Sequence, residues 1–246
     1  MCKSPEGFYL TADENQSIYG RGYSWRQVSS DLRVQGRSIL LRNNYRTTMQ
    51  IQEAAAAFLH QGEAYDEDSM AVPVHEGPLP TLCECEADST AIAYWFRRWA
   101  DELRLPVHMG AVLTPTNGQA EEIAENLCSQ GVKAQAFRSG DLEVDAPVVK
   151  CMTLHASKGL EFPFVAVAGL TADRIPRKSY TPVDEDDWNE HVNQERKLLH
   201  VALTRAMWRL LVCSPDRDGS EFISGLAPNY WRTVAQPAAR GDSSGA

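Results

Sequence analysis

The sequence predicts a doubly wound α/β fold, in which helices cover both faces of a mainly parallel β-sheet. Short apolar runs of strand length alternate along the chain with segments that have helical periodicity. Apolar residues make up 43% and charged residues 23% of the chain, as in ordinary globular proteins. Strands that alternate with helices indicate parallel pairing with right-handed crossovers.

The expected strands are mostly β-branched or continuously apolar, which is typical of strands covered on both faces. In chain order they are residues 8–13, 37–41, 110–114, 134–137, 148–153, 164–169 and 208–213.

Between these runs, apolar residues recur at the i, i+3, i+4, i+7 spacing of an amphipathic helix. This spacing predicts helices over residues 50–60, 90–104 and 119–130, and a further helical stripe follows Glu195. Gly131 stands where a left-handed residue would end the third helix.

Two polar stretches, residues 61–80 and 171–190, are expected to be solvated surface connections. The second runs from a basic half with Arg174, Arg177 and Lys178 into an acidic half at residues 184–187. The formal net charge is −9, from 24 Lys and Arg against 33 Asp and Glu. This acidity argues weakly against a non-specific nucleic-acid coat and leaves a local basic groove open.

No apolar run approaches the length of a membrane span, and the first residues lack the apolar core of a secretion signal. We therefore expect a cytoplasmic protein with reduced cysteines and no membrane partner. Cys83 and Cys85 have a single spacer and no matching cysteine or histidine cluster. We expect buried thiols there and no metal site.

Four segments carry candidate chemistry. The first follows the strand at 8–13 and contains Gln16, whose amide can contact a phosphate oxygen or a water. The second contains Tyr45 and Arg46, followed by Thr47 or Thr48 as the N-cap of a helix. A helix N-terminus and an arginine both favour phosphate. A plain polar turn and a surface ion pair are the respective alternatives.

The third segment, residues 153–162, lies between two apolar strands and forms a strand-edge loop with Lys158 and Glu161. It lacks the G-x-x-x-x-G-K-[ST] pattern of a phosphate-binding P-loop, which is absent from the whole chain. The fourth segment, residues 195–206, is helical and places Arg205 close to its end. Such an arginine can stabilise a transferring phosphoryl group, or can simply complement the helix dipole.

These segments read QSIYG, NYRTT, TLHASKGLEF and ERKLLHVALTRA. In order and approximate spacing they resemble motifs III to VI of UvrD/Rep/PcrA-like superfamily 1 DNA helicases. The resemblance extends over roughly residues 8–213. It implies the RecA-like second lobe of a P-loop NTPase superfamily motor, preceded by the end of the first lobe.

The resemblance also implies roles at the nucleotide. Gln16 matches a glutamine near the γ-phosphate that couples it to DNA, and Tyr45 matches a tyrosine that stacks on adenine. Arg46 matches an arginine on the γ-phosphate, Glu161 a glutamate near the ribose, and Arg205 the arginine finger.

Four further residues match the side of such helicases that contacts single-stranded DNA: Tyr19, Arg21, His155 and Lys158. An aromatic residue usually precedes the Arg-Gly pair of motif III, whereas Gly20 stands here.

The resemblance predicts three parts: the end of the first lobe at residues 1–33, the second lobe at 34–232, and a flexible tail at 233–246. ATP and Mg²⁺ are the expected ligands, with the Mg²⁺ ligands on a Walker-bearing lobe that this sequence lacks. The expected function is therefore half of a helicase ATP site, inactive in isolation. The alternative is a non-catalytic nucleotide- or DNA-binding module.

Overall fold

The computed structural model describes residues 43–59, 72–85, 89–143, 145–178, 181, 183–215, 219–224 and 226–235. The expected strands at 8–13 and 37–41, together with Gln16, Tyr19 and Arg21, lie outside these residues. Within them, no helix is both long and apolar enough to span a bilayer.

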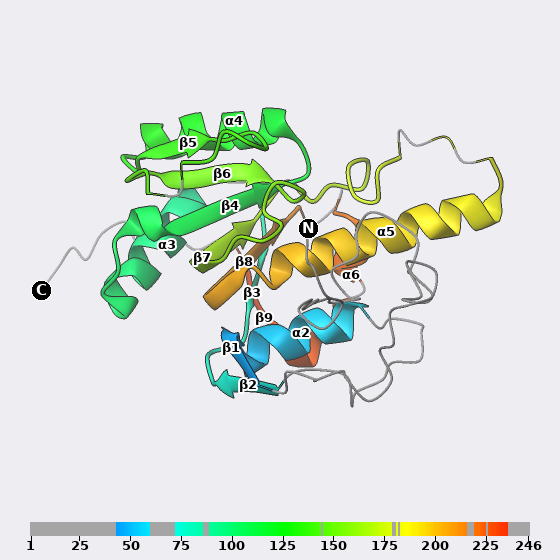
Figure 1. Ribbon diagram of the computed structural model, residues 1–246, viewed down its shortest axis with the longest axis horizontal. Helices are drawn as coiled ribbons and strands as arrows, with labels where there is room; N and C mark the ends of the chain where they lie inside the picture. Colours follow the sequence, from blue (N-terminus) through cyan, green and yellow to red (C-terminus); the bar gives the residue numbers. More distant parts are fainter. Residues whose placement is uncertain are drawn as a thin grey trace, which may run out of the picture.

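A seven-stranded sheet forms the centre of the fold (Figure 1), and every pairing between its neighbouring strands is parallel. The spatial order is β5-β6-β4-β7-β8-β3-β9. The strands are β3 (Thr81–Glu84), β4 (Gly110–Thr114), β5 (Ala134–Ala136), β6 (Val149–Thr153), β7 (Phe162–Val167), β8 (Ala206–Ser214) and β9 (Arg232–Ala235).

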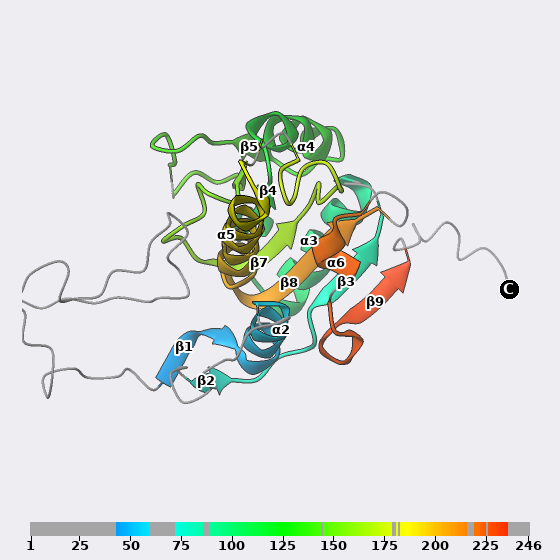
Figure 2. The ribbon, with the colours of Figure 1, turned by 90° about the vertical axis from the view of Figure 1, so that its right-hand side faces the viewer.

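The predicted doubly wound α/β fold is confirmed, because helices cover both faces of this sheet (Figures 1 and 2). Helices α2 (Met49–Leu59) and α5 (Glu185–Leu203) pack on one face. Helices α3 (Ser89–Leu103) and α4 (Asn117–Ser129) pack on the other. Three short helices complete the described elements: η4 (Val107–Met109), α6 (Glu221–Ser224) and η5 (Pro228–Tyr230).

Alternation along the central strands explains why they are mostly apolar on both faces. In β4, Leu113 lies in the core beside α2 and α5, whereas Val112 lies in the core beside α3 and α4. In β7, Val165 and Phe164 divide in the same way. Because successive side chains point to opposite faces, a strand with helices on both sides has no polar face.

Helix α4 has the ends that its sequence predicts. Thr116 is its N-cap, and its hydroxyl accepts a hydrogen bond from the backbone N–H of Gln119. Gly131 has a φ of 74°, and the next N–H donates back to the carbonyl of Leu127 at 2.9 Å. This is the left-handed cap expected at Gly131.

The acidic half of the 171–190 stretch is helical, so the prediction of a surface connection is wrong there. Asp184 is the N-cap of α5 and accepts from the backbone N–H of Asp187 at 2.8 Å. The first turn carries three carboxylates. Negative charge is favourable at a helix N-terminus, which explains why this charge run starts a helix.

A second, two-stranded sheet consists of β1 (Asn43–Thr48) paired in parallel with β2 (Val72–His75). Strand β2 falls within the stretch 61–80, so part of that expected loop is a strand. Its exposure alternates from residue to residue, and Pro73 is tolerated because this is a short edge strand. Strand β9 likewise includes residues 233–235, which the sequence assigns to a tail.

Candidate functional site

Two of the predicted site residues, Arg46 and Glu161, form an ion pair. Arg46 lies on β1 and its Nε contacts Oε1 of Glu161, the residue immediately before β7. Both side chains are partly open to solvent, at 41% and 36% exposure. The fold therefore joins residues that are 115 positions apart in the chain and leaves the pair accessible to a ligand.

Asn44 and Thr47 fix the position of Arg46, and neither was predicted to do so. The Oδ1 atom of Asn44 accepts from the backbone N–H of Arg46 at 2.8 Å, and its Nδ2 donates to Gln52 of α2. The buried hydroxyl of Thr47 donates to the carbonyl of Ala206 at 2.8 Å. An asparagine two residues before the arginine is the sequence signal for such a side-chain turn.

The expectation that Thr47 or Thr48 caps the following helix is wrong. Thr47 lies inside β1 and bonds to β8 instead. The hydroxyl of Thr48 is fully buried and makes no hydrogen bond to the described part of the chain. Both threonines point into the protein because β1 packs against the start of β8, which competes with local capping.

Arg205 lies beside this ion pair but is itself buried, with 1% of its surface exposed. Its Nε donates to the carbonyl of Val201 at 2.8 Å, and its Nη2 contacts the hydroxyl of Thr204 at 3.2 Å. Its Nη1 donates to the carbonyl of Leu160 at 3.3 Å, one residue before Glu161. The predicted position close to the helix end is thus confirmed, while the guanidinium bonds to protein oxygens.

Tyr45 directly precedes Arg46 on β1, and the residue is 64% exposed. We call the four predicted residues Tyr45, Arg46, Glu161 and Arg205 the motif cluster. The cluster lies at the amino ends of β7 and β8, since Glu161 and Arg205 each immediately precede one of these strands. The backbone N–H of Phe162 also donates to the carbonyl of Arg205 at 3.0 Å.

The loop of residues 154–161 crosses the face of the sheet, whereas the sequence predicts a loop confined to a strand edge. It leaves the carboxyl end of β6 and enters the amino end of β7, and both strands run parallel to β4 between them. Its start and end therefore lie at opposite edges of the sheet. His155 is close to one edge and Glu161 to the other.

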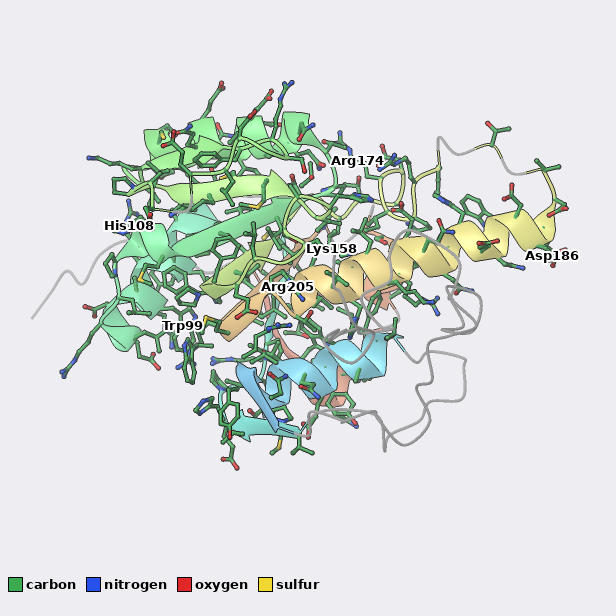
Figure 3. The ribbon with its side chains drawn as sticks, viewed as in Figure 1. Trp99, His108, Lys158, Arg174, Asp186 and Arg205 are labelled. Atoms are coloured by element: carbon green, nitrogen blue, oxygen red, sulfur yellow. The ribbon has the colours of Figure 1, made fainter. Side chains whose placement is uncertain are left out.

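This loop is held by its own hydrogen bonds. Ser157 is fully buried, and its hydroxyl donates to the carbonyl of Leu154 at 2.7 Å. The backbone N–H of Leu160 donates to the carbonyl of Ser157 at 3.0 Å. Gly159 has a φ of 84°, which residues with a side chain rarely adopt. Lys158 is exposed on the loop, while Arg205 lies at the end of α5 (Figure 3).

His155 is half-buried at the carboxyl end of β6. Burial lowers the pKa of His155, the nearby charge of Glu195 raises it, and that of Arg177 lowers it. Glu195 comes from α5 and Arg177 from the loop after β7. This edge therefore gathers groups from three separate elements.

The buried thiols are where the sequence places them. Cys83 and Cys85 both lie in the core beside α3, together with Cys213 of β8. Hydrogen bonds with Cys83 and Cys85, and burial, raise the pKa of Cys213. Within the described residues, no group of three or more His, Cys, Asp or Glu side chains is arranged to hold a metal ion.

Comparisons with known proteins bear on the second half of the chain. Residues 133–216 match the family of UvrD-like helicase C-terminal domains, a range that includes His155, Lys158, Glu161 and Arg205. The ATP-dependent DNA helicase Rep of Escherichia coli (strain K12) is 38% identical over 86 residues, which are 34% of this chain and 12% of Rep. The ATP-dependent DNA helicase PcrA of Leuconostoc citreum is 35% identical over 104 residues, which are 38% of this chain and 13% of PcrA.

The chain thus matches about an eighth of the length of these curated relatives. A solved structure, the C-terminal domain of a possible DNA helicase from Lactobacillus plantarum, has the same fold. Its TM-score is 0.53 at 18% identity, covering 77% of this chain and 98% of that domain. Over residues 133–216, the family match and the identity to these helicases show the C-terminal part of a UvrD-like superfamily 1 helicase.

Proposed function

We propose that this chain supplies the second RecA-like lobe, residues 34–232, of an ATP-dependent DNA helicase or translocase of the UvrD type. ATP would bind between this lobe and a Walker-bearing lobe, which would also provide the Mg²⁺ ligands. One observation carries the proposal: the contacts of Arg46 with Glu161 and of Arg205 with Leu160 bring motifs IV, V and VI together at one place.

Arg46 is the residue of this cluster best placed to sense a γ-phosphate. Its guanidinium is 41% exposed, so an incoming phosphate can reach it without rearrangement of the core. Its bond with Glu161 holds the side chain in place, and a doubly charged phosphate competes well for a planar guanidinium. Glu161 then becomes available for a ribose hydroxyl, and Tyr45 offers an exposed ring for the adenine.

Arg205 is proposed as the arginine finger, acting after a local change. Its bond to the Leu160 carbonyl is long, at 3.3 Å, against 2.8 Å for its bond to Val201. Exchange of that bond for a phosphate oxygen would direct Nη1 toward the nucleotide while Nε stays anchored. Closure of the two lobes would favour this exchange, because it places negative charge next to the guanidinium.

On the other side, His155 and Lys158 would contact single-stranded DNA, together with Tyr19 and Arg21. Gln16 would couple this contact to the γ-phosphate. Lys158 is exposed and provides a point charge for a backbone phosphate. His155 and Lys158 belong to the same loop as Glu161, which gives the two binding functions a common covalent element.

The burial of Arg205 favours a second candidate function, a non-catalytic nucleotide- or DNA-binding module. In that case Arg205 would be a structural residue, and Arg46 with Glu161 would bind a nucleotide without assisting hydrolysis.

The test combines this chain with a Walker-bearing first lobe of a Rep-type helicase and measures DNA-stimulated ATP hydrolysis. Arg46→Ala should lower kcat on the order of 10³-fold, as removal of an arginine that stabilises phosphoryl transfer does. Arg138→Ala is the matched control, since Arg138 forms an exposed pair with Glu121 at 2.9 Å on another surface. We expect this control to leave the rate unchanged.

The two candidates give different results in this assay. No stimulation by the combined lobes, with nucleotide binding retained, would support the non-catalytic module. Hydrolysis by this chain alone, well above background, would contradict the half-site on which the proposal rests.

A further inference from the structure

The loop that follows β7 carries three exposed cations that do not belong to the motif cluster. Arg174, Arg177 and Lys178 lie within residues 171–178, and all three are exposed. The acidic residue of this segment is Asp173, so its formal charge is 3 − 1 = +2 in a chain whose net charge is −9. We call residues 171–178 the basic loop.

Although its cations are exposed, the backbone of the basic loop is firmly anchored. Ile175 is fully buried in the core beside α5, and the hydroxyl of Ser220 donates to its carbonyl. The backbone N–H of Ser220 donates to the carbonyl of Leu170 at 3.0 Å, just before the loop. Within the loop, the N–H of Lys178 reaches the carbonyl of Asp173 at 3.4 Å. Such anchoring fixes where the cations emerge and reduces the ordering cost of binding.

The basic loop lies at the same edge of the sheet as His155. It continues from the carboxyl end of β7, and the loop of residues 154–161 starts at the carboxyl end of β6. The pKa of His155 is lowered by burial and also by the charge of Arg177, which places that guanidinium near the imidazole. The N-terminal half of α5 lies close as well, because Nε2 of His191 is 3.3 Å from the carbonyl oxygen of Arg177.

Asp173 neutralises only part of this charge. Its carboxylate accepts a hydrogen bond from the hydroxyl of Thr171 and lies 3.8 Å from Nε of Arg174. The Thr171 hydroxyl, and the charges of Arg174 and Lys178, lower the pKa of Asp173. The acidic first turn of α5 begins beyond His191, with Asp187 about one helical turn from it, and Asp186 lies at the end of the helix far from the sheet (Figure 3).

We propose that Arg174, Arg177 and Lys178 bind the phosphate backbone of single-stranded DNA. They would extend its path from Lys158 and His155 along the carboxyl ends of β6 and β7. This inference rests on the proposed function and adds three residues to it. Exposed cations on an anchored loop suit phosphates, which position a strand without reading its sequence. Arginine adds a fork that matches a phosphate in two hydrogen bonds.

The experiment measures binding of a fluorescent oligo(dT) strand to the full chain at several salt concentrations. The test variant is R174A/R177A/K178A. The control is K133A/R138A/R232A. It also removes two arginines and one lysine, but from exposed positions in other parts of the chain. Each lost phosphate contact should reduce the slope of log K against log salt by ~0.7 for a single strand, so three contacts reduce it by ~2. The control should keep a slope close to that of the wild type.

A third variant, R174K/R177K/K178R, separates charge from loop structure. It keeps all three charges. We therefore expect it to restore at least two thirds of the slope of log K against log salt that the alanine variant loses. If it binds as poorly as the alanine variant, the loss comes from a disturbed loop and the inference is overturned. Equal weakening by the test and control variants would also overturn it, since net charge alone would then explain the effect.

Failure of this inference can be told from failure of the proposed function. If the wild-type chain does not bind oligo(dT), the DNA role and this inference fall together. If the wild type binds and Lys158→Ala weakens it, but R174A/R177A/K178A keeps the wild-type slope, the proposed function stands and the basic loop has no part in it.

Discussion

Replacing Arg205 by alanine should destabilise the fold, whatever its effect on catalysis. The side chain is 1% exposed and donates hydrogen bonds to the Val201 and Leu160 carbonyls and to the Thr204 hydroxyl. The Val201 carbonyl keeps a second donor, the hydroxyl of Thr204 at 2.9 Å. The carbonyl of Leu160 loses its arginine donor, and a cavity remains where the side chain was.

The magnitude follows from these contacts. Hydrogen bonds that involve a charged group contribute about 1.5–3 kcal/mol each, and the bond of 2.8 Å should lie at the upper end. Loss of the buried aliphatic part adds to this cost. Removal of a buried charge offsets some of it, because a guanidinium is costly to desolvate. We expect a net loss of about 2–4 kcal/mol in the free energy of unfolding.

Urea denaturation followed by tryptophan fluorescence measures this change. The midpoint should fall while the m value stays the same, because the surface exposed on unfolding is unchanged. Arg138→Ala, which removes an exposed arginine, should leave the urea midpoint close to that of the wild type. An Arg205→Ala variant as stable as the wild type would refute the structural reading. Its hydrolysis rate would then report on the arginine finger alone.

Three other predictions concern packing, hydrogen bonding and pH. Gly110→Ala should cost about 1–3 kcal/mol in urea unfolding, because an added Cβ would lie 2.6 Å from Cδ2 of the buried Phe164 ring. Thr47→Val should cost about 1–2 kcal/mol by losing its bond to β8, whereas Thr48→Val, which removes a buried hydroxyl with no hydrogen bond among the described residues, should be neutral or stabilising in the same assay. The pKa of His155 is lower in the folded chain than its unfolded value of 6.5. The unfolded chain therefore binds more protons at this residue, and the free energy of unfolding should fall as the pH drops through 6.5 toward the folded pKa. His155→Gln should make unfolding measured between pH 7 and 5 less pH-dependent.

The sequence predicts the centre of the sheet well for a physical reason. Strands β4, β6 and β7 have helices on both faces, so they are mostly apolar and stand out from their surroundings, although β6 includes the buried Lys150. The outer strands β3 and β9 were not predicted. Each has four residues with two adjacent apolar residues and no regular alternation, and such a short pattern also occurs in loops.

Polar residues gave the larger errors, because tertiary contacts decide their conformation. A threonine before a helix is a good N-cap locally, yet Thr47 bonds to a carbonyl 159 positions away. The residues next to Thr47 in the sequence give no indication of that partner. The error at residues 184–187 has a different origin. The acidic run is itself a signal of a helix start, but it also fits the solvated loop that we predict there.

The candidate residues were found from motifs, whereas their grouping needed the fold. The resemblance implies that Arg46 and Glu161 lie at one nucleotide, on the γ-phosphate and near the ribose, but it does not indicate that they contact each other. Asn44 lies inside the same motif and holds the backbone of Arg46. Its role follows from its spacing to Arg46 and could have been predicted from the sequence.

The path of residues 154–161 would let the proposed lobe serve both a nucleotide and a strand of DNA. The loop crosses a sheet whose central strand β4 has five residues, which at ~3.3 Å per residue is on the order of 16 Å. His155 and Glu161 stand near its two ends, and buried Ser157 fixes the middle. A ligand that displaces Glu161 therefore acts on a segment pinned three to four residues away. The displacement is either absorbed within Lys158, Gly159 and Leu160 or passed to Arg205 through the Leu160 carbonyl. Lys158 lies in that segment. Displacement of Glu161 by a nucleotide would therefore reach the proposed DNA contact at Lys158 without any movement of the sheet.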